Sequence, residues 1–415
     1  MKTVSFCTLG CRVNQYESRA LAELFVRNGY EVLPFGEHVD VCIVNTCAVT
    51  EESERKSAQM IRRAMKLCED VRVCGCFAQR SGEFEGISRL SGCGSKGEMQ
   101  DFLKIDCTEK GYELLQIGHV GAEKLCGFSG SRAYVKIQDG CNGRCTYCII
   151  PRLRGGVRSR PPEEIISEVK RLADSGYKEI ILTGIETAAY NYMPLWELIR
   201  RVAEVEGVER LRLGSLDPNV LTPDFIRTVK ETKKLMPHFH ISLQSGCSRI
   251  LRLMGRAYTA EDAKEKLLSL KAARAEIELS ADIICSFPTE TAEELKETAE
   301  YLKEIGFLHI HAFSYSKRPD TPAAAMEGQI PEEEKKVRMR YFLEECEAMA
   351  LTRLEGKVGN TAEVLVEKTV KDGAVGHTAD FCEAFIKTNR PLKQRDTVKC
   401  TVLSVKDGKL CCEAV

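Results

Sequence analysis

The sequence predicts an α/β protein built from three domains. Strand and helix patterns alternate at 1–120, which is typical of a parallel α/β domain. Six further strand–helix units at 127–354 predict a partial TIM-like (β/α)6 barrel. At 356–415 the pattern changes to short strands with glycine-containing turns, which predicts a small all-β barrel. A chain of 415 residues is long enough for each domain to bury its own core.

Composition limits the function before any motif is considered. The formal net charge is -1, so nucleic-acid binding would have to come from local basic patches. Twenty cysteines is a high count for a chain whose first residues read as a strand and not as a signal peptide. No apolar run is long enough to span a membrane, so we expect a cytoplasmic protein. In a reducing compartment, some of these cysteines are better explained by metal or cluster ligation than by disulfides.

Three cysteines of the first domain each follow a predicted strand. The strands are expected at 2–8, 41–45 and 71–74, with helices at 14–28 and 51–67 between them. Cys11, Cys47 and Cys76 come just after these strands. Ligands of parallel sheets gather beyond the carboxyl ends of the strands, so we expect these side chains to converge on a cluster site. Periodicity alone leaves the alternative of three unrelated cysteines open.

Other cysteines of this domain have a simpler interpretation. Cys7 and Cys74 lie within strands, where alternate side chains enter the core, and we expect them to pack there. Between the first two domains, residues 81–95 are rich in Gly and Ser, and residues 118–132 read as a linker.

The central domain is predicted from a second strand–helix alternation. The strands are expected at 133–138, 178–183, 208–214, 238–243, 278–285 and 309–315. The helices are expected near 162–175, 194–205, 222–234, 260–274, 290–305 and 331–353. Catalytic groups of such barrels lie at the carboxyl ends of the strands.

A cysteine triplet follows the first of these strands, before an Arg-rich turn at 152–160. Cys141, Cys145 and Cys148 have the spacing C-x3-C-x2-C. Three close thiolates suit an iron–sulfur cluster better than zinc, because zinc usually takes a fourth protein ligand. A structural zinc site with a distant fourth ligand is the alternative. The spacing resembles that of the radical S-adenosylmethionine (SAM) enzymes.

Polar side chains follow the other strands of the barrel. They are Thr183, Gly184 and Glu186 after the second strand, Ser215 and Asp217 after the third, Gln244 and Ser245 after the fourth, and Ser286 after the fifth. For Asp217 and Ser245 taken alone, an ordinary solvated loop is the simpler interpretation. Histidines 238, 240, 309 and 311 lie nearer the strand starts, where we expect neutral, hydrogen-bonded side chains and not metal ligands.

The C-terminal domain carries a basic segment. Its strands are expected at 360–369, 374–387 and 397–415, with turns at Asp372-Gly373 and Asp407-Gly408. The basic residues are Lys387, Arg390, Lys393, Arg395 and Lys399. RNA binding and an ordinary solvated loop are both compatible with this run. Phe381 and Phe385 could stack on bases, although a core position is the simpler interpretation.

Three local stretches identify a family. They are residues 8–18 (TLGCRVNQYES), residues 45–50 (NTCAVT) continued by 55–57 (RKS), and residues 136–151 around the cysteine triplet. In this order they resemble the radical-SAM methylthiotransferases over nearly the whole chain. The resemblance implies an N-terminal methylthiotransferase domain, a radical-SAM core and a C-terminal RNA-binding TRAM domain.

The sequence around Cys11 resembles that of one branch of this family. Leu-Gly-Cys-Arg-Val-Asn-Gln-Tyr-Glu is similar to the branch that acts on threonylcarbamoyladenosine in tRNA. The branch that acts on isopentenyladenosine usually has Gly-Cys-Gln-Met-Asn, and the branch that modifies a ribosomal protein usually has Gly-Cys-Pro-Lys-Asn. Residues 313–318 and 321–323 also resemble the first branch. A non-catalytic, RNA-binding iron–sulfur sensor is the alternative from another class.

The resemblance also implies cofactors and contacts. Two 4Fe–4S clusters would lie on the two cysteine triplets. SAM would chelate the open iron on the second triplet and be cleaved, with one electron from a flavodoxin-like donor, to a radical that attacks C2 of adenosine 37. Tyr147 and the polar residues after the strands would contact SAM or substrate. Arg152, Arg154, Arg158 and Arg160 would grip phosphates of the anticodon loop, unless they are ordinary surface charges. The oligomeric state is left open, with a monomer as the expectation.

Two stretches depart from the family pattern. The family commonly has Gly-Ile-Asn followed by a glycine where this chain has residues 184–188, GIETA. The family's Gly-Phe-Pro-Gly-Glu is replaced by residues 286–290, SFPTE. Without these glycines, side chains could keep the backbone from coming as close to SAM or substrate.

Overall fold

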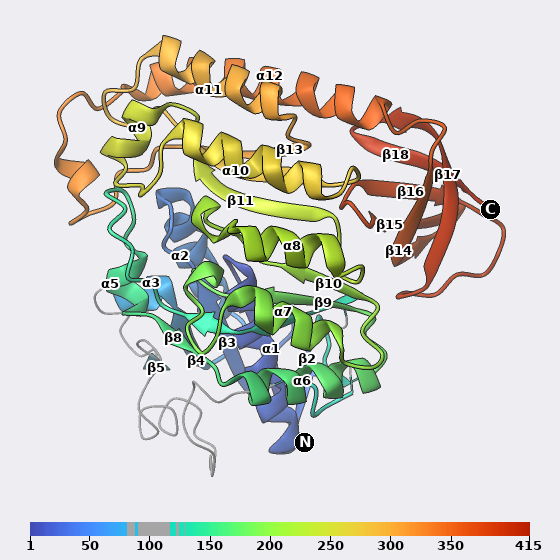
Figure 1. Cartoon of the computed structure of the whole chain (residues 1–415). Helices are drawn as coiled ribbons and strands as arrows, with labels where there is room; N and C mark the ends of the chain where they lie inside the picture. The colour runs from blue at the N-terminus through green and yellow to red at the C-terminus, as the bar shows by residue number, and fades with distance from the viewer. Residues whose placement is uncertain (81–87, 90–116, 122–123, 129) are drawn as a thin grey trace.

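The computed structural model describes residues 1–80, 88–89, 117–121, 124–128 and 130–415 (Figure 1). The Gly- and Ser-rich stretch predicted at 81–95 lies outside the described residues, except for 88–89. None of the helices in the described part of the chain has the length and apolar character that a bilayer crossing needs. The domain boundaries stay predictions, and the three parts are called the N-terminal sheet, the central barrel and the C-terminal barrel below.

The N-terminal sheet is parallel, with the strand order β2-β1-β3-β4-β5. Its strands are β1 (Lys2–Thr8), β2 (Tyr30–Leu33), β3 (Val41–Thr46), β4 (Asp70–Gly75) and β5 (Ser88–Arg89). The three predicted strands and their parallel pairing are confirmed. The sequence analysis missed β2, because four residues are too few for a clear period of two to emerge.

Helix α1 (Arg12–Arg27) joins the N-terminal sheet to the central barrel. Both of its faces are covered, which explains why polar side chains such as Glu17 and Glu23 are buried on it. Its Arg19 donates to the Tyr177 hydroxyl at 3.0 Å in the central barrel. Helix α2 (Glu51–Met65) starts with a capping box in which Thr50 and Ser53 satisfy each other's backbone N–H groups. The short helix α3 (Cys76–Arg80) follows β4 without a loop.

Six parallel strands form the central barrel. They are β6 (Arg132–Lys136), β9 (Glu179–Thr183), β10 (Arg210–Leu213), β11 (His238–Gln244), β12 (Glu278–Cys285) and β13 (His309–Ser314). The two three-stranded sheets β6-β9-β10 and β11-β12-β13 are connected by bridges at Leu211–Leu235 and Leu216–Ile241. Since the described residues form no pairing between β13 and β6, the barrel is open there, and the predicted parallel α/β core is confirmed.

Helices cover the outside of the open barrel (Figure 1). They are α6 (Pro162–Asp174), α7 (Leu195–Ala203), α8 (Pro223–Glu231), α9 (Ser248–Leu253), α10 (Ala260–Ala273), α11 (Ala292–Ile305) and α12 (Glu332–Glu355). Figure 1 shows α12 running along the molecule to the C-terminal barrel. Helices α10 and α11 start with capping boxes at Thr259 and Thr291, which fixes where each begins after its loop.

The segment after β6 differs from the prediction. The strand expected at 133–138 stops at Lys136, and the Arg-rich turn contains helix α5 (Ile150–Arg154) and strand β8 (Arg158–Ser159). Strand β8 pairs antiparallel with β7 (Gln138–Asp139). Gly140 makes this fold possible, because a Cβ there would lie 2.0 Å from the Gly156 carbonyl oxygen.

The C-terminal barrel is closed, in the strand order β14-β15-β16-β18-β17. Its strands are β14 (Thr361–Val370), β15 (Gly373–Thr378), β16 (Glu383–Lys387), β17 (Thr397–Lys406) and β18 (Lys409–Ala414). The predicted small all-β barrel is therefore confirmed. The single strand expected at 374–387 is wrong, because a turn with Phe381 at φ 68° separates β15 from β16.

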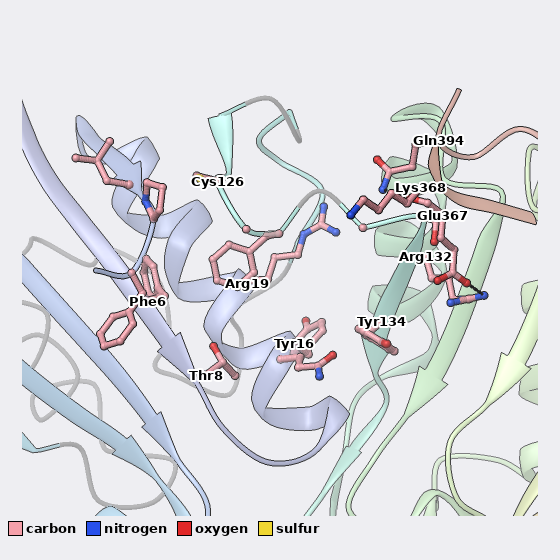
Figure 2. A pocket seen from close by; sticks show the side chains of 18 residues that line it. Phe6, Thr8, Tyr16, Arg19, Cys126, Arg132, Tyr134, Glu367, Lys368 and Gln394 are labelled. Carbon is pink, nitrogen blue, oxygen red and sulfur yellow. Dashed lines mark hydrogen bonds and ion pairs between the residues drawn. The ribbon is translucent and has the colours of Figure 1, made fainter. Parts of the chain in front are cut away.

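A cavity of about 790 Å³ lies where the three parts meet (Figure 2). Figure 2 shows Phe6 and Arg19 of the N-terminal sheet and α1 on one side, with Lys368 and Gln394 of the C-terminal barrel on the other. None of the six predicted cluster cysteines is among the described residues that line it. This cavity is therefore separate from the predicted cluster sites.

One buried carboxylate connects the starts of three barrel strands. Glu179 on β9 pairs with Arg210 at 2.9 Å, Arg212 at 3.0 Å and Arg132. Burial opposes the ionisation of Glu179, but the arginines outweigh it and hold the pKa of this carboxyl at about 2. Arg132 also pairs with Glu367 of β14, so the same group fastens the C-terminal barrel to the central barrel.

We predict that Glu179→Gln strongly destabilises the protein. The substitution leaves three buried guanidinium groups without their shared counter-charge, which costs roughly 3–5 kcal/mol of unfolding free energy. Urea unfolding followed by circular dichroism measures this loss. The control is Glu209→Gln, which removes an exposed pair with Lys178 (3.3 Å) and should change stability by less than about 0.5 kcal/mol. Equal midpoints for Glu179→Gln and the wild type would contradict the assignment.

Candidate functional site

The three N-terminal cysteines lie together at one edge of the sheet. Cys11, Cys47 and Cys76 directly follow β1, β3 and β4, which are neighbours in the strand order. The backbone of Gly10 touches Cys47, since a Cβ on Gly10 would lie 2.9 Å from the Cys47 Cβ and 3.1 Å from its Sγ. Gly10 has φ 96°, a conformation that favours glycine. The structure therefore places these three cysteines in one group, as the strand topology predicts.

Polar side chains hold this group in place. Asn14 donates to the Leu9 carbonyl oxygen at 2.8 Å and to the Thr46 carbonyl oxygen at 3.0 Å, which connects the Cys11 and Cys47 loops. The Cys11 thiol donates to the Asn14 Oδ1 at 3.5 Å. Burial raises the pKa of the Cys76 thiol to about 11, and the Arg154 guanidinium opposes that shift. By contrast, Cys74 is buried in the core, as predicted for packing.

The second triplet lies on the loop between β7 and α5. Cys141, Cys145 and Cys148 are all half-buried. The loop is anchored at its centre by Thr146, whose backbone N–H donates to the Met254 carbonyl oxygen at 2.9 Å and whose hydroxyl donates to the Leu253 carbonyl oxygen at 2.8 Å. The triplet thus keeps a defined backbone and leaves its thiols accessible.

Two N–H groups point at the sulfurs of this triplet. The Gly143 backbone N–H donates to the Cys141 Sγ at 3.2 Å, and the Arg256 Nη1 donates to the Cys145 Sγ at 3.3 Å. Arg256 is held by Asp217 at 2.7 Å and by the Ser242 carbonyl oxygen at 2.9 Å. N–H donors to sulfur are a usual feature of iron–sulfur sites. The sequence analysis missed Arg256, since a single Arg in a loop carries no signal of its direction.

Neither triplet closes around a single point in the described residues. Within the described residues, no three Cys, His, Asp or Glu side chains come close enough together to hold one ion. A zinc site needs such a convergence, whereas a 4Fe–4S cluster binds each thiolate to a different iron. The cluster assignment of both triplets stays a prediction.

The polar residues after β9 are packed against Gln138. A Cβ on Gly184 would lie 2.8 Å from the Gln138 Oε1, and the Glu186 backbone N–H donates to the same oxygen at 2.9 Å. Burial and then the neighbouring Asp217 carboxylate raise the pKa of Glu186 to about 7, while Arg256 opposes the shift. Thr183 is buried at the end of its strand. These residues lie at the carboxyl ends of the strands, and their contact with SAM stays a prediction.

The other predicted contacts differ in their exposure. Ser215 is half-buried beyond β10, and Gln244 ends β11 with φ 73°, where the register with β12 shifts. Tyr147 packs in an apolar cluster that includes Met254 and Phe287. Their roles toward SAM or substrate likewise stay predictions.

The departures from the family's glycines at residues 286–290 occur at strained positions. Ser286 has φ 62° and Thr289 has φ 69°, so both adopt the left-handed conformation that favours glycine. The Ser286 side chain is fully buried, and its hydroxyl has no hydrogen-bond partner among the described residues. The backbone N–H of Ser286 donates to Glu290 at 2.5 Å. This strand end keeps the backbone form of a glycine turn while it carries larger side chains.

Two of the four predicted phosphate-binding arginines are buried, and that prediction is wrong for them. Arg154 and Arg160 are 8% and 6% exposed. Arg160 donates to Glu168 at 2.7 Å and to the Tyr16 hydroxyl at 3.1 Å, and Arg154 pairs with Glu17 at 2.9 Å. Arg152 is exposed, and the side chain of Arg158 is one-third exposed. Only these two remain candidates for phosphate contact.

The C-terminal basic run is also divided. Lys387, Arg390 and Lys393 are exposed on the C-terminal barrel. Arg395 instead stacks on Tyr177 with 3.7 Å between its guanidinium carbon and the ring centre, and it donates to the Ser175 carbonyl oxygen at 3.2 Å. It therefore fastens the C-terminal barrel to the central barrel, and its role in RNA binding stays a prediction.

The histidines and Phe381 have structural roles. His238 and His240 contact the Ser280 hydroxyl at 2.9 and 2.8 Å, which confirms the expectation of hydrogen-bonded side chains. Phe381 is half-buried and stacks on His238 with 4.8 Å between ring centres, which favours a packing role for this ring. His309 and His311 are both exposed, and they line a cavity of about 730 Å³ together with His238, His240 and Phe381.

We predict that Ser286→Gly stabilises the protein by about 1 kcal/mol. It removes a strained backbone, which costs about 1–3 kcal/mol, and an unpaired buried hydroxyl, while added freedom of the unfolded chain offsets roughly 0.4–1 kcal/mol. Urea unfolding measures the gain. Ser286→Ala removes the hydroxyl and keeps the strain, so its stability should lie between those of the wild type and Ser286→Gly. A glycine variant less stable than the wild type would refute this interpretation.

Comparisons with known proteins agree with this geometry. Residues 135–302 match the family description "Radical SAM superfamily", and residues 3–90 match "Uncharacterized protein family UPF0004". The structure of the radical SAM methyltransferase TsrM from Kitasatospora setae has the same fold, with a TM-score of 0.58 at 14% identity over 78% of this chain and 76% of that one.

Two curated relatives extend over almost the whole chain. The tRNA-2-methylthio-N(6)-dimethylallyladenosine synthase of Aquifex aeolicus (strain VF5) is 35% identical, with 89% of each protein covered. The threonylcarbamoyladenosine tRNA methylthiotransferase MtaB of Bacillus subtilis (strain 168) is 36% identical over 409 residues, which cover 93% of this chain and 91% of that protein. The chain belongs to the radical-SAM methylthiotransferase family.

Proposed function

We propose that this protein adds a methylthio group to C2 of threonylcarbamoyladenosine, next to the anticodon of tRNA. The observation that carries the proposal is a second cysteine triplet on the N-terminal sheet, whose Cys76 is contacted by the buried Arg154 from the segment that follows the radical-SAM triplet. A radical-SAM enzyme with a single cluster needs only one such triplet. The N-terminal triplet of Cys11, Cys47 and Cys76 gives the enzyme a place for a sulfur-supplying cluster.

The residues fit two 4Fe–4S clusters. Membership of the radical SAM superfamily implies SAM and one 4Fe–4S cluster, which Cys141, Cys145 and Cys148 would hold. Cys11, Cys47 and Cys76 would hold the second. Together these groups supply one-electron cleavage of SAM and a sulfur atom for an unreactive C–H carbon, chemistry that no side-chain acid or base provides. A flavodoxin-like protein is the proposed electron donor.

The chain's own residues bind and orient these groups. Gly143 and Arg256 direct N–H groups at two sulfurs of the SAM-side triplet. Thr146 fixes the loop that carries this triplet to the end of α9. Asn14 connects the loops of Cys11 and Cys47. Positioning of this kind matters most where two reacting centres must meet one substrate atom.

The substrate assignment rests on the relatives and on the positions of basic residues. Curated proteins with the threonylcarbamoyladenosine activity in their names are 33–36% identical to this chain. The exposed Arg152 and the partly exposed Arg158 follow the second triplet in the sequence and would contact phosphates of the anticodon loop. Lys387, Arg390 and Lys393 on the C-terminal barrel would hold another part of the same tRNA. The cytoplasm, where tRNA is found, is the proposed location.

Nucleoside mass spectrometry of tRNA from a strain that lacks this gene tests the substrate. The 2-methylthio derivative of threonylcarbamoyladenosine should disappear and return when the wild-type gene is restored. Cys145→Ala should not restore it, because this thiolate is needed for the SAM-side cluster. The exposed Cys126 lies outside both triplets, so Cys126→Ala should restore it fully. If the methylthio derivative of isopentenyladenosine is lost instead, the alternative tRNA substrate is correct.

Iron and sulfide analysis of the anaerobically reconstituted protein tests the two-cluster arrangement. The wild type should bind about eight irons per chain. The triple variant Cys11→Ala/Cys47→Ala/Cys76→Ala should bind about four, and the triple variant Cys141→Ala/Cys145→Ala/Cys148→Ala should also bind about four. Cys126→Ala should match the wild type. A wild type with about four irons would rule out the second cluster.

A further inference from the structure

Arg154 belongs to the central barrel but acts on the N-terminal cysteines. It is the last residue of α5, six positions after Cys148 in the sequence. Its side chain is buried between the central barrel and the N-terminal sheet, and it contacts residues of both. The second triplet and the guanidinium that reaches the first triplet are thus carried by one short segment of chain.

The N–H groups of the Arg154 guanidinium donate to several residues. Its Nε donates to the Cys76 Sγ at 3.3 Å. Its Nη2 donates to the Asn14 Oδ1 at 2.7 Å, the same oxygen that accepts from the Cys11 thiol at 3.5 Å. Arg154 therefore touches one N-terminal cysteine directly and reaches a second through one amide.

The positive charge of Arg154 is balanced by two carboxylates. Its Nη1 donates to the Glu17 Oε1 at 2.9 Å and to the Asp139 Oδ1 at 3.1 Å. Lys136 pairs with the same two carboxylates at 3.2 Å each. Glu17 comes from α1 and Asp139 from β7. The guanidinium of Arg154 is therefore held by one carboxylate from each side of the interface. These two ion pairs fix the orientation in which the Arg154 Nε points at the Cys76 sulfur.

The same arrangement occurs at the other triplet. Arg256 is held by Asp217 and donates to the Cys145 Sγ at 3.3 Å, as Arg154 is held by carboxylates and donates to the Cys76 Sγ at 3.3 Å. Each triplet therefore receives one N–H donor from a buried, carboxylate-anchored arginine. A guanidinium used only for ion pairing would not need to direct Nε at a weak acceptor such as sulfur.

We propose that Arg154 is a positioning residue that sets the geometry and the reduction potential of the cluster on Cys11, Cys47 and Cys76. This inference rests on the proposed second cluster. A positive charge and an N–H donor at a ligand sulfur stabilise the more negative, reduced form of a cluster, and so raise its potential. The cluster of the N-terminal sheet would then be correctly tuned only when α5 of the central barrel is docked on it.

The test isolates the N-terminal cluster. The parent is the full chain with Cys141→Ala/Cys145→Ala/Cys148→Ala, reconstituted anaerobically, and the midpoint potential of its cluster is measured by redox titration followed by electron paramagnetic resonance. Arg154→Gln should shift this potential to more negative values. Arg154→Lys keeps a charge for Glu17 and Asp139 but cannot serve all partners at once, so it should give a smaller shift in the same direction.

Two controls separate tuning from a general loss of structure. Arg152→Gln changes an exposed arginine of the same helix, which pairs with Asp320 at 3.6 Å, and should leave the potential unchanged. In the chain with Cys11→Ala/Cys47→Ala/Cys76→Ala, Arg154→Gln should leave the potential of the SAM-side cluster unchanged. If Arg154→Gln fails to fold, as judged by circular dichroism, Arg154→Lys decides the question.

The outcomes distinguish this inference from the proposed function. A parent that binds no cluster overturns both the two-cluster function and the role of Arg154. A parent whose cluster keeps its potential in the Arg154 variants overturns only the role of Arg154. Equal shifts of both clusters also overturn it, because the effect would then not be specific to the N-terminal cluster.

Discussion

The structure depends on a buried group of charges between the N-terminal sheet and the central barrel. Glu17, Lys136, Asp139 and Arg154 are all buried and pair with one another across this interface. Burying charges is costly unless each is compensated, so such a group tolerates only one arrangement of its two sides. Cys11, Cys47 and Cys76 lie on one side and Cys141, Cys145 and Cys148 on the other. The charges therefore hold Arg154, which follows the second triplet in the sequence, against Cys76 of the first.

Much of the fold could be predicted because it follows from periodic patterns. The parallel strands, the open barrel and the convergence of Cys11, Cys47 and Cys76 all follow from strand–helix alternation and from the rule that loops after parallel strands meet at one edge. Short elements could not be predicted. Strand β2 has only four residues, and the turn between β15 and β16 depends on the positive φ of Phe381.

The sequence does not show which of the four arginines after the second triplet are buried and which are exposed. Arg152, Arg154, Arg158 and Arg160 follow one another closely, yet alternate ones point outward and inward. Their direction is decided by acidic partners such as Glu17 and Glu168, which are distant in the sequence and approach only after folding. The contact of Arg256 with Cys145 could not be predicted for the same reason. Sequence patterns locate ligands well when the ligands share a spacing, and locate isolated tuning groups poorly.

The placement of the C-terminal barrel has a consequence for substrate choice. This barrel packs near the starts of the central strands, through Glu367 and Thr378, while Cys141, Cys145 and Cys148 come after the carboxyl end of β6. An RNA that is held by Lys387 or Lys393 and also presents a base to the cysteines must extend along the molecule. With both of these proposed contacts, the length of the RNA would count in substrate choice as well as the identity of its base.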